Sequence, residues 1–372
     1  MGHTVHIYAQ HDPKDRIVHQ SVFDAGLLDT TIYLNQLPAL RRSKIILLIQ
    51  KWFQSFFTEA SWVLFKALYK NYSSLSFYNF IFFLDKPAYD IVHAHFGLNG
   101  NYVCELKKLG LFKNAKFVTT FHGYDLNNSF KNSYKRSGLF SICNAFTVNS
   151  KYSLTKLIEL ECRRNRIQIL PVGLDFSQFQ RRFSTNDNIQ QIKILFVGRL
   201  IPLKGPDKVV EICRILNQKA DIDFKTKIIG EGEMMMYLNH LIKDYKLENK
   251  IELLGPQTSE SIIEEMDHAD IFLFPGITYE GKAETQGLVI QEAQAMQLPV
   301  LISDAGGMKE GMIDGETGFV LHENDLAAFV EKIELLAAST ELRKKMGERG
   351  RNFVKQKYDS LLLNKQLLTI YQ

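Results

Sequence analysis

Short apolar segments alternate with amphipathic ones along most of this chain, which restricts the folds that it can adopt. The apolar segments have the length of strands and occupy residues 4–9, 90–97, 115–123, 144–150, 192–198, 225–230, 250–255, 270–276 and 298–303. One buried helix face is indicated between them by the spacing of Val209, Ile212, Cys213 and Leu216. The alternation predicts an α/β protein whose parallel sheets are flanked by helices.

Two domains are expected from the length of 372 residues, because one ordinary core does not grow to that size. The same strand and helix pattern occurs in both halves, which predicts two doubly wound α/β domains in tandem. The pattern gives way to a polar run after residues 167–179, so we place the first domain at 1–178 and the second at 179–355. An apolar stripe in 356–372 predicts a last helix that packs back toward the first domain.

Composition narrows the class of protein further. A net charge of +4 suits anionic ligands such as phosphates, but it is too small to indicate nucleic acid binding. The four cysteines are scattered without a Cys-x-x-Cys pair, which predicts buried thiols in a reducing compartment. No secretory signal opens the sequence, and the most apolar stretch, 71–84, is too short to span a bilayer. These features predict a cytoplasmic protein.

Residues 41–70 differ from the rest of the chain. They hold six lysine and arginine residues against one acid, Glu59, interleaved with six tryptophan and phenylalanine residues. Basic, aromatic helices of this kind can lie in a membrane interface, here the inner face of the plasma membrane. The alternative interpretation is a set of helices that pack their aromatic side chains into the core of the first domain.

The loops after the predicted strands are where a site is expected, because open α/β sheets bind ligands at the carboxyl ends of their strands. Arg199 and Lys204 lie in the loop after 192–198, where a guanidinium and an ammonium group could neutralise a diphosphate. His122 ends another strand and precedes Gly123, which permits close approach of backbone or ligand. The alternatives are a solvent-facing pair of cations and a structural histidine.

The stretch "ETQGLVIQE" places Glu284 and Glu292 on either side of a glycine turn. We expect a helix to start near Gly287, and its free N–H groups would form an anion site. Glu292 has the wrong charge for phosphate but suits a pair of hydroxyls such as a ribose diol. Glu284 would then reach the other end of a nucleotide-linked molecule, unless both acids are simply solvated.

Two possible metal motifs are not favoured. His93 and His95 alternate on a predicted strand and face one side, but no third ligand follows at a suitable spacing. The "DID" sequence at 221–223 imitates the Asp-x-Asp of some sugar transferases, yet it lies on the amino side of a strand, the wrong end for a site. We therefore predict no metal site.

Together these residues resemble the retaining GT-B glycosyltransferases of family 4. The resemblance rests on "FVGRLIPLKG", "GEGEMMMYL", "IELLG", "ADIFLFPG" and the Glu-x7-Glu element that begins at Glu284, and it covers nearly all of 190–355. In the first half, "DIVHAHFG", "VTTFHGYD" and "ILPVGLDFSQF" also match. The chain is most similar to bacterial transferases that build capsule, exopolysaccharide or colanic-acid-like polymers.

The resemblance implies two Rossmann-like domains that face each other across a cleft, with a UDP- or GDP-type nucleotide sugar held mainly by the second. The residues that it assigns to the donor are Arg199 and Lys204 at the diphosphate, the N–H groups of Gly287 and Leu288 beside it, and Glu292 at the ribose. The catalytic candidates are Glu284 at the donor sugar and His122, which would approach from the first domain.

The same resemblance implies an activity. It predicts transfer of a hexose, with retention of configuration, to a glycan or lipid-linked acceptor, without a metal or another cofactor. The family normally opens with a strand, a glycine-containing loop and a helix before the segment that resembles "GHTVHIYA", so we expect either a start upstream of Met1 or a truncated chain. A nucleotide-sugar epimerase of the same architecture and a non-catalytic binding member of an assembly complex are the alternatives.

Overall fold

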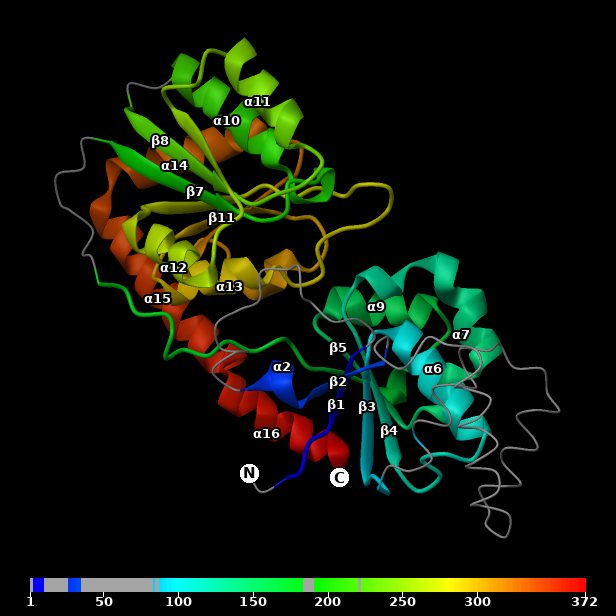
Figure 1. The fold of residues 1–372 in the computed structure, drawn as a ribbon. Helices are drawn as coiled ribbons and strands as arrows, with labels where there is room; N and C mark the ends of the chain where they lie inside the picture. Colours follow the sequence, from blue (N-terminus) through cyan, green and yellow to red (C-terminus); the bar gives the residue numbers. More distant parts are fainter. Residues whose placement is uncertain (1–2, 10–25, 35–82, 84–86, 183–190, 220–221) are drawn as a thin grey trace, which may run out of the picture. The chain divides into compact units, whose positions relative to one another are not determined.

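A computed structural model describes residues 3–9, 26–34, 83, 87–182, 191–219 and 222–372 (Figure 1). The chain divides into two compact units, Met1–Thr119 with Asn132–Asn144, and Thr120–Lys131 with Ala145–Gln372. The basic, aromatic segment 41–70 lies outside the described residues. No helix within the described ranges is long and apolar enough to cross a membrane.

A four-stranded sheet is formed by segments from the first half of the sequence. Its four strands run in the order β3-β4-β5-β6, and a separate parallel pair joins β1 to β2. The strands are β1 (Ile7–Ala9), β2 (Thr31–Tyr33), β3 (Ile91–His95), β4 (Lys116–Phe121), β5 (Ala145–Val148) and β6 (Ile167–Ile169). The helices are α2 (Leu27–Thr30), α6 (Gly97–Lys108), α7 (Lys131–Ser137), α8 (Leu139–Ile142) and α9 (Lys151–Glu159).

The larger sheet has six parallel strands in the order β12-β11-β10-β7-β8-β9. The strands are β7 (Ile192–Val197), β8 (Phe224–Ile229), β9 (Ile251–Gly255), β10 (Ile271–Phe274), β11 (Val300–Ser303) and β12 (Gly318–Leu321). The helices are α10 (Pro206–Lys219), α11 (Met235–Asp244), α12 (Ser259–His268), α13 (Leu288–Ala295), α14 (Leu326–Ala338), α15 (Thr340–Tyr358) and α16 (Ser360–Tyr371). The order of strands reverses between β7 and β10, which makes this a doubly wound sheet with a switch point there.

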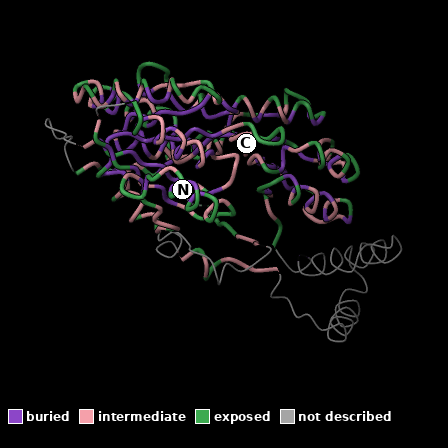
Figure 2. The backbone as a smooth tube through the Cα atoms, turned by 90° about the horizontal axis from the view of Figure 1, so that it is seen from above, coloured by how far each residue is buried: buried purple, intermediate pink, exposed green. Residues whose placement is uncertain are grey.

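Burial explains why the apolar segments form strands. Every residue of β10 and β11 is buried, as expected for inner strands of a parallel sheet that is covered on both faces. The helix face predicted from Val209, Ile212, Cys213 and Leu216 is fully buried on α10. Figure 2 shows how buried and exposed residues alternate along the helices, so each helix packs one side against its sheet.

The predicted α/β pattern is confirmed, since each of the nine predicted apolar segments overlaps an observed strand. Three strands of three or four residues, β2, β6 and β12, were not predicted. β6 lies inside 167–179, which the sequence indicated only as a boundary. All four cysteines are buried and free, as predicted.

Candidate active site

The candidate residues of the second half gather at the switch point of the larger sheet. The loop with Arg199 and Lys204 follows β7, and the loop with Glu284 follows β10, its neighbour. Parallel strands bring their carboxyl ends to one edge, so the two loops meet there although about eighty residues separate them in sequence. This is the position at which doubly wound sheets bind ligands.

The loop after β7 is held tightly against the end of β10. Gly205 closes the 3-10 turn Pro202–Lys204 with a φ of 68°, and a side chain at this position would lie 2.1 Å from the carbonyl oxygen of Pro275. Only glycine satisfies both conditions. The turn directs Lys204 toward Glu284, with the Lys204 Nζ 5.7 Å from the centre of the Phe274 ring.

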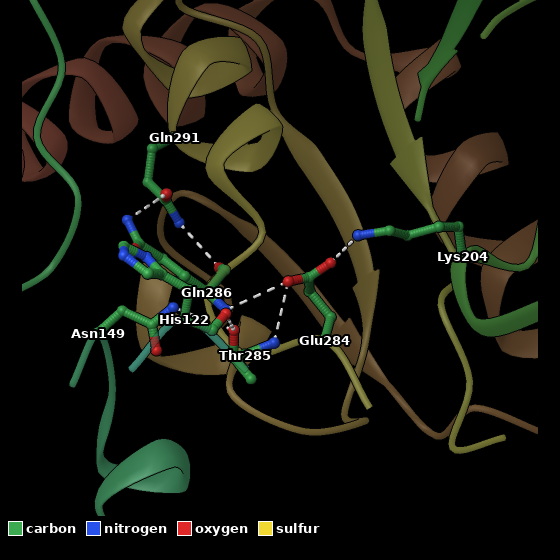
Figure 3. Close-up of polar contacts among 7 residues, drawn as sticks. All are labelled: His122, Asn149, Lys204, Glu284, Thr285, Gln286 and Gln291. Atoms are coloured by element: carbon green, nitrogen blue, oxygen red, sulfur yellow. Dashed lines mark hydrogen bonds and ion pairs between the residues drawn. The ribbon is translucent and has the colours of Figure 1, made fainter. Parts of the chain in front are cut away.

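Glu284 has two sets of partners in this arrangement. One carboxylate oxygen, Oε2, pairs with the ammonium group of Lys204, and Oε1 accepts a hydrogen bond of 2.9 Å from the N–H of Thr285 (Figure 3). Helix α13 begins after Gly287, which has a φ of 71° and offers no side-chain cap. The helix start predicted near Gly287 is therefore confirmed, and the first N–H groups of α13 have no partner within the helix.

Burial shifts the pKa values of two candidate residues toward neutral pH. The pKa of Lys204 is lowered to about 8, mainly by burial and to a smaller extent by the positive charge of Arg199. Burial also raises the pKa of the half-buried Glu292 to about 7. Among the described residues, the carboxylate of Glu292 has no hydrogen-bond or ion-pair partner, and the guanidinium of Arg199 is exposed. Two opposite charges are thus left for a ligand to satisfy.

His122 follows β4 in a turn that a buried acid holds in place. The Oδ1 atom of Asp125 accepts 3.0 Å hydrogen bonds from the N–H groups of both His122 and Gly123. Burial lowers the pKa of the His122 imidazole, and the carboxylate of Asp125 opposes that shift. His122 is therefore neutral near pH 7. The turn belongs to the same compact unit as Glu284.

A buried hydroxyl connects these two candidate catalytic segments. The Thr285 Oγ1 atom donates to the carbonyl oxygen of His122 at 3.3 Å and accepts from the Asn149 side chain at 3.0 Å (Figure 3). The next residue, Gln286, bonds the backbone of Val172 through both ends of its amide, at 2.9 and 3.0 Å. The segment that carries Glu284 is thereby tied to two distant parts of the chain.

Sequence reasoning missed these supporting residues, which lie within or opposite "ETQGLVIQE". Gln286 and Gln291 are both buried and bonded to each other, and the Nε2 atom of Gln291 donates to the carbonyl of Gln286. A signal was present in the sequence, because Gln291 and Gln294 occupy the inner face of a helix whose other buried residues are apolar. Asn149 gave no such signal.

Three of the residues considered for metal binding, His93, His95 and Asp223, lie within the described part of the chain, whereas Asp221 lies outside it. The rings of His93 and His95 stack with centroids 4.6 Å apart, as their alternation on a strand predicts. Asp223 precedes β8 and pairs with Lys250 at 2.6 Å. Nowhere in the described part of the chain do three metal-binding side chains come together.

Comparison with known proteins extends these observations over the whole chain. The model for glycosyl transferases group 1 matches residues 177–353, and the model for glycosyltransferase family 4 matches residues 1–178. The chain is 28% identical to the colanic acid biosynthesis glycosyltransferase WcaL of Salmonella typhimurium, over 100% of this chain and 93% of the relative. It is 33% identical to the amylovoran biosynthesis glycosyltransferase AmsK of Erwinia amylovora, over 65% of this chain and 60% of the relative.

Solved structures support the same fold. A glycosyltransferase from Rickettsia africae aligns with a TM-score of 0.66 at 24% identity, covering 94% of this chain and 86% of its own. HepE of Anabaena, crystallised with UDP, aligns with a TM-score of 0.65 at 18% identity, covering 76% and 78%. Two parallel α/β sheets with these matches define the GT-B class of architecture. The chain belongs to glycosyltransferase family 4, a family of nucleotide-sugar-dependent glycosyltransferases.

Proposed function

We propose that this glycosyltransferase moves a hexose from a nucleoside-diphosphate sugar to a glycan or lipid-linked acceptor, with retention of configuration, during synthesis of a cell-surface polysaccharide. The observation that carries the proposal is the meeting of Lys204, Glu284 and the start of α13 at the switch point. Relatives named for colanic acid, amylovoran and capsule biosynthesis support the pathway class.

The donor would lie across the switch point. Arg199 and Lys204 would bind the diphosphate together with the N–H groups of Gly287 and Leu288, because two cations and a helix start attract the same anion. The unpartnered carboxylate of Glu292 would accept hydrogen bonds from the ribose hydroxyls. Solved structures of HepE with UDP and with UDP-glucose support a donor of this kind.

The reaction would use charge that is already in place. The acceptor oxygen forms a bond to the anomeric carbon on the same face from which the leaving group departs. The bond between that carbon and the phosphate oxygen breaks. The acceptor proton passes to the departing phosphate. Lys204 and Arg199 stabilise the charge that develops on the diphosphate, Glu284 lies at the donor sugar, and His122 contacts that sugar from its own turn.

The domain division at residue 178 also stays a proposal. The two family models meet at 177–178, which supports it. Within this scheme 356–372 is the closing helix, and the basic segment 41–70 would bring the first domain to the inner membrane surface that carries a lipid-linked acceptor. Binding of the full chain to anionic vesicles, compared with a chain whose six cations in 41–70 are glutamine, tests that contact.

Donor binding should depend on pH with a maximum between about 7 and 8. Glu292 must lose its proton to accept from the ribose, so affinity falls as pH drops below its raised pKa of about 7. Lys204 loses its charge above its lowered pKa of about 8, so affinity falls again on that side. Calorimetry with UDP-glucose, whose diphosphate does not titrate here, measures both limbs. Glu292→Gln should remove the acidic limb and Lys204→Arg the alkaline one; a flat wild-type profile would contradict both assignments.

A donor screen tests the function itself. The full chain is incubated with a panel of nucleotide sugars, and thermal stabilisation identifies the donor that it binds. Transfer to a lipid-linked acceptor extract is then followed by mass spectrometry, and the anomeric configuration of the product is read by NMR. An altered nucleotide sugar formed without acceptor would indicate an epimerase, and stabilisation by no nucleotide sugar would favour a non-catalytic protein.

A further inference from the structure

The Thr285 hydroxyl occupies a position that the proposed chemistry does not use. It is buried, with 8% of the residue exposed, and it lies between the carbonyl of His122 and the amide of Asn149. A hydroxyl has one proton to donate, and here it goes to the carbonyl of His122 while the amide of Asn149 supplies the complementary donor. The Thr285 hydroxyl therefore both donates and accepts a hydrogen bond within the protein (Figure 3).

The remaining backbone around Thr285 is fixed from other directions. The N–H of Gly307 donates to the carbonyl of Glu284 at 2.8 Å, and a side chain on Gly307 would lie 2.1 Å from the carbonyl oxygen of Thr285. Gln286, the residue after Thr285, is bonded through its side chain to the backbone of Val172. These contacts fix the backbone of the loop, and the Thr285 hydroxyl adds a side-chain hydrogen bond that joins it to the turn of His122.

Close packing shows that the turn and the loop fit each other. Gly123, with a φ of 118°, faces Thr285 so closely that an added Cβ would lie 2.8 Å from its methyl carbon. The side-chain oxygen of Asn149 is itself held, accepting from the hydroxyl of Ser153 at 2.6 Å. The donor of Asn149 is therefore directed at Thr285 by a partner on helix α9.

We propose that Thr285 is a positioning residue for transfer: its hydroxyl keeps the loop that carries Glu284 in register with the turn that carries His122. This inference rests on the proposed function, because it assumes that both residues act on the donor sugar. A displacement of about 1 Å in a reacting group can cost about a hundredfold in rate. Loss of the hydroxyl should therefore reduce the rate of transfer more than the binding of donor.

The test compares variants that differ by single atoms. Thr285→Val replaces the hydroxyl by a methyl group and should lower kcat about 10- to 100-fold while the donor Kd changes less than about threefold. Thr285→Ser retains the hydroxyl and should stay within about threefold of wild type. Thr226→Val is the matched control, since Thr226 is also buried and its hydroxyl lies 3.2 Å from the Cys213 sulfur, away from the loop.

Asn149→Asp gives a second test that leaves the loop residue unchanged. An ionised carboxylate only accepts, so it competes for the Thr285 proton and turns the hydroxyl away from the carbonyl of His122. We expect a loss of kcat like that of Thr285→Val. The loss relative to wild type should shrink as pH falls, because a protonated aspartic acid donates as the native amide does.

Hydrogen exchange provides a readout that does not need activity. Peptides that cover 121–126 and 282–288 should both exchange faster than in wild type when Thr285 is replaced by valine. In Thr226→Val their exchange rates should equal those of wild type. If exchange is unaltered, or if kcat of Thr285→Val equals that of wild type or of Thr226→Val, the positioning role is wrong. If wild type neither binds nor transfers any sugar, the proposed function is wrong, and the positioning role in transfer is overturned with it; the exchange pattern then reports only a structural link.

Discussion

Glu284→Gln should lower the rate of transfer by about three orders of magnitude, without weakening the binding of nucleotide diphosphate. In the unliganded chain the carboxylate of Glu284 pairs with the ammonium group of Lys204, both side chains being mostly buried. The proposed donor needs that same ammonium group for its diphosphate. Glutamine removes the negative charge that competes for Lys204, so UDP should bind as tightly as to wild type or up to about tenfold tighter.

The combination of lost transfer and retained binding separates two possible roles of Glu284. If the residue acted only as a structural partner of Lys204, its removal would release a buried lysine and weaken the protein without a selective effect on transfer. Single-turnover kinetics measures the rate, and calorimetry measures the affinity. Glu280→Gln is the control, because Glu280 is an exposed acid in the same loop. Transfer by Glu284→Gln within about tenfold of wild type would exclude a catalytic role.

The loops that form the candidate site could be predicted from the sequence, whereas the contacts that shape it could not. Apolar segments identify buried strands, and the rule that ligands bind at the carboxyl ends of strands selects the loops with Arg199, Glu284 and His122. The helix start at Gly287 follows from the glycine and the apolar residues after it. These inferences need only local patterns.

The supporting contacts depend on neighbours that are far apart along the chain. Asn149 lies 136 positions from Thr285, and Val172 lies 114 positions from Gln286. A single sequence carries no signal that an asparagine after one strand will meet a threonine after another. The raised pKa of Glu292 is of the same kind, because it comes from burial by the folded chain. The sequence therefore identified charged groups and missed the neutral ones that hold them.

The direct contact between Lys204 and Glu284 adds a condition on donor binding. The sequence motifs assign the two residues to different ends of the donor, Lys204 to the diphosphate and Glu284 to the sugar. In the structure they neutralise each other. In the proposed binding mode the donor would therefore exchange an internal ion pair for contacts with the ligand, and the net gain from Lys204 would be smaller than from an unpaired lysine. Arg199, which is exposed, carries no such cost.

Replacing both cations should remove most of the affinity for the donor. A hydrogen bond to a charged group contributes about 1.5–3 kcal/mol, so the double variant Arg199→Gln/Lys204→Gln should bind UDP about two to four orders of magnitude more weakly. Because Lys204 is paired with Glu284 before the ligand arrives, Arg199→Gln alone should account for the larger share. Calorimetry on the two single variants and the double variant measures each contribution.

The matched control for this prediction removes the same charge at a different place. Lys208→Gln/Arg214→Gln also takes two positive charges from the segment after β7, but from helix α10, where Lys208 already pairs with Asp207 and Glu211. This double variant should bind UDP within about threefold of wild type, because both cations are half-buried on α10 and already have partners there, the Gln218 amide and the Tyr245 ring in the case of Arg214. Equal losses in both double variants would mean that net charge alone attracts the nucleotide. Unchanged binding in Arg199→Gln/Lys204→Gln would show that the diphosphate does not bind at the switch point. The roles proposed for Glu284 and Glu292 would then fall as well, because they depend on that orientation of the donor.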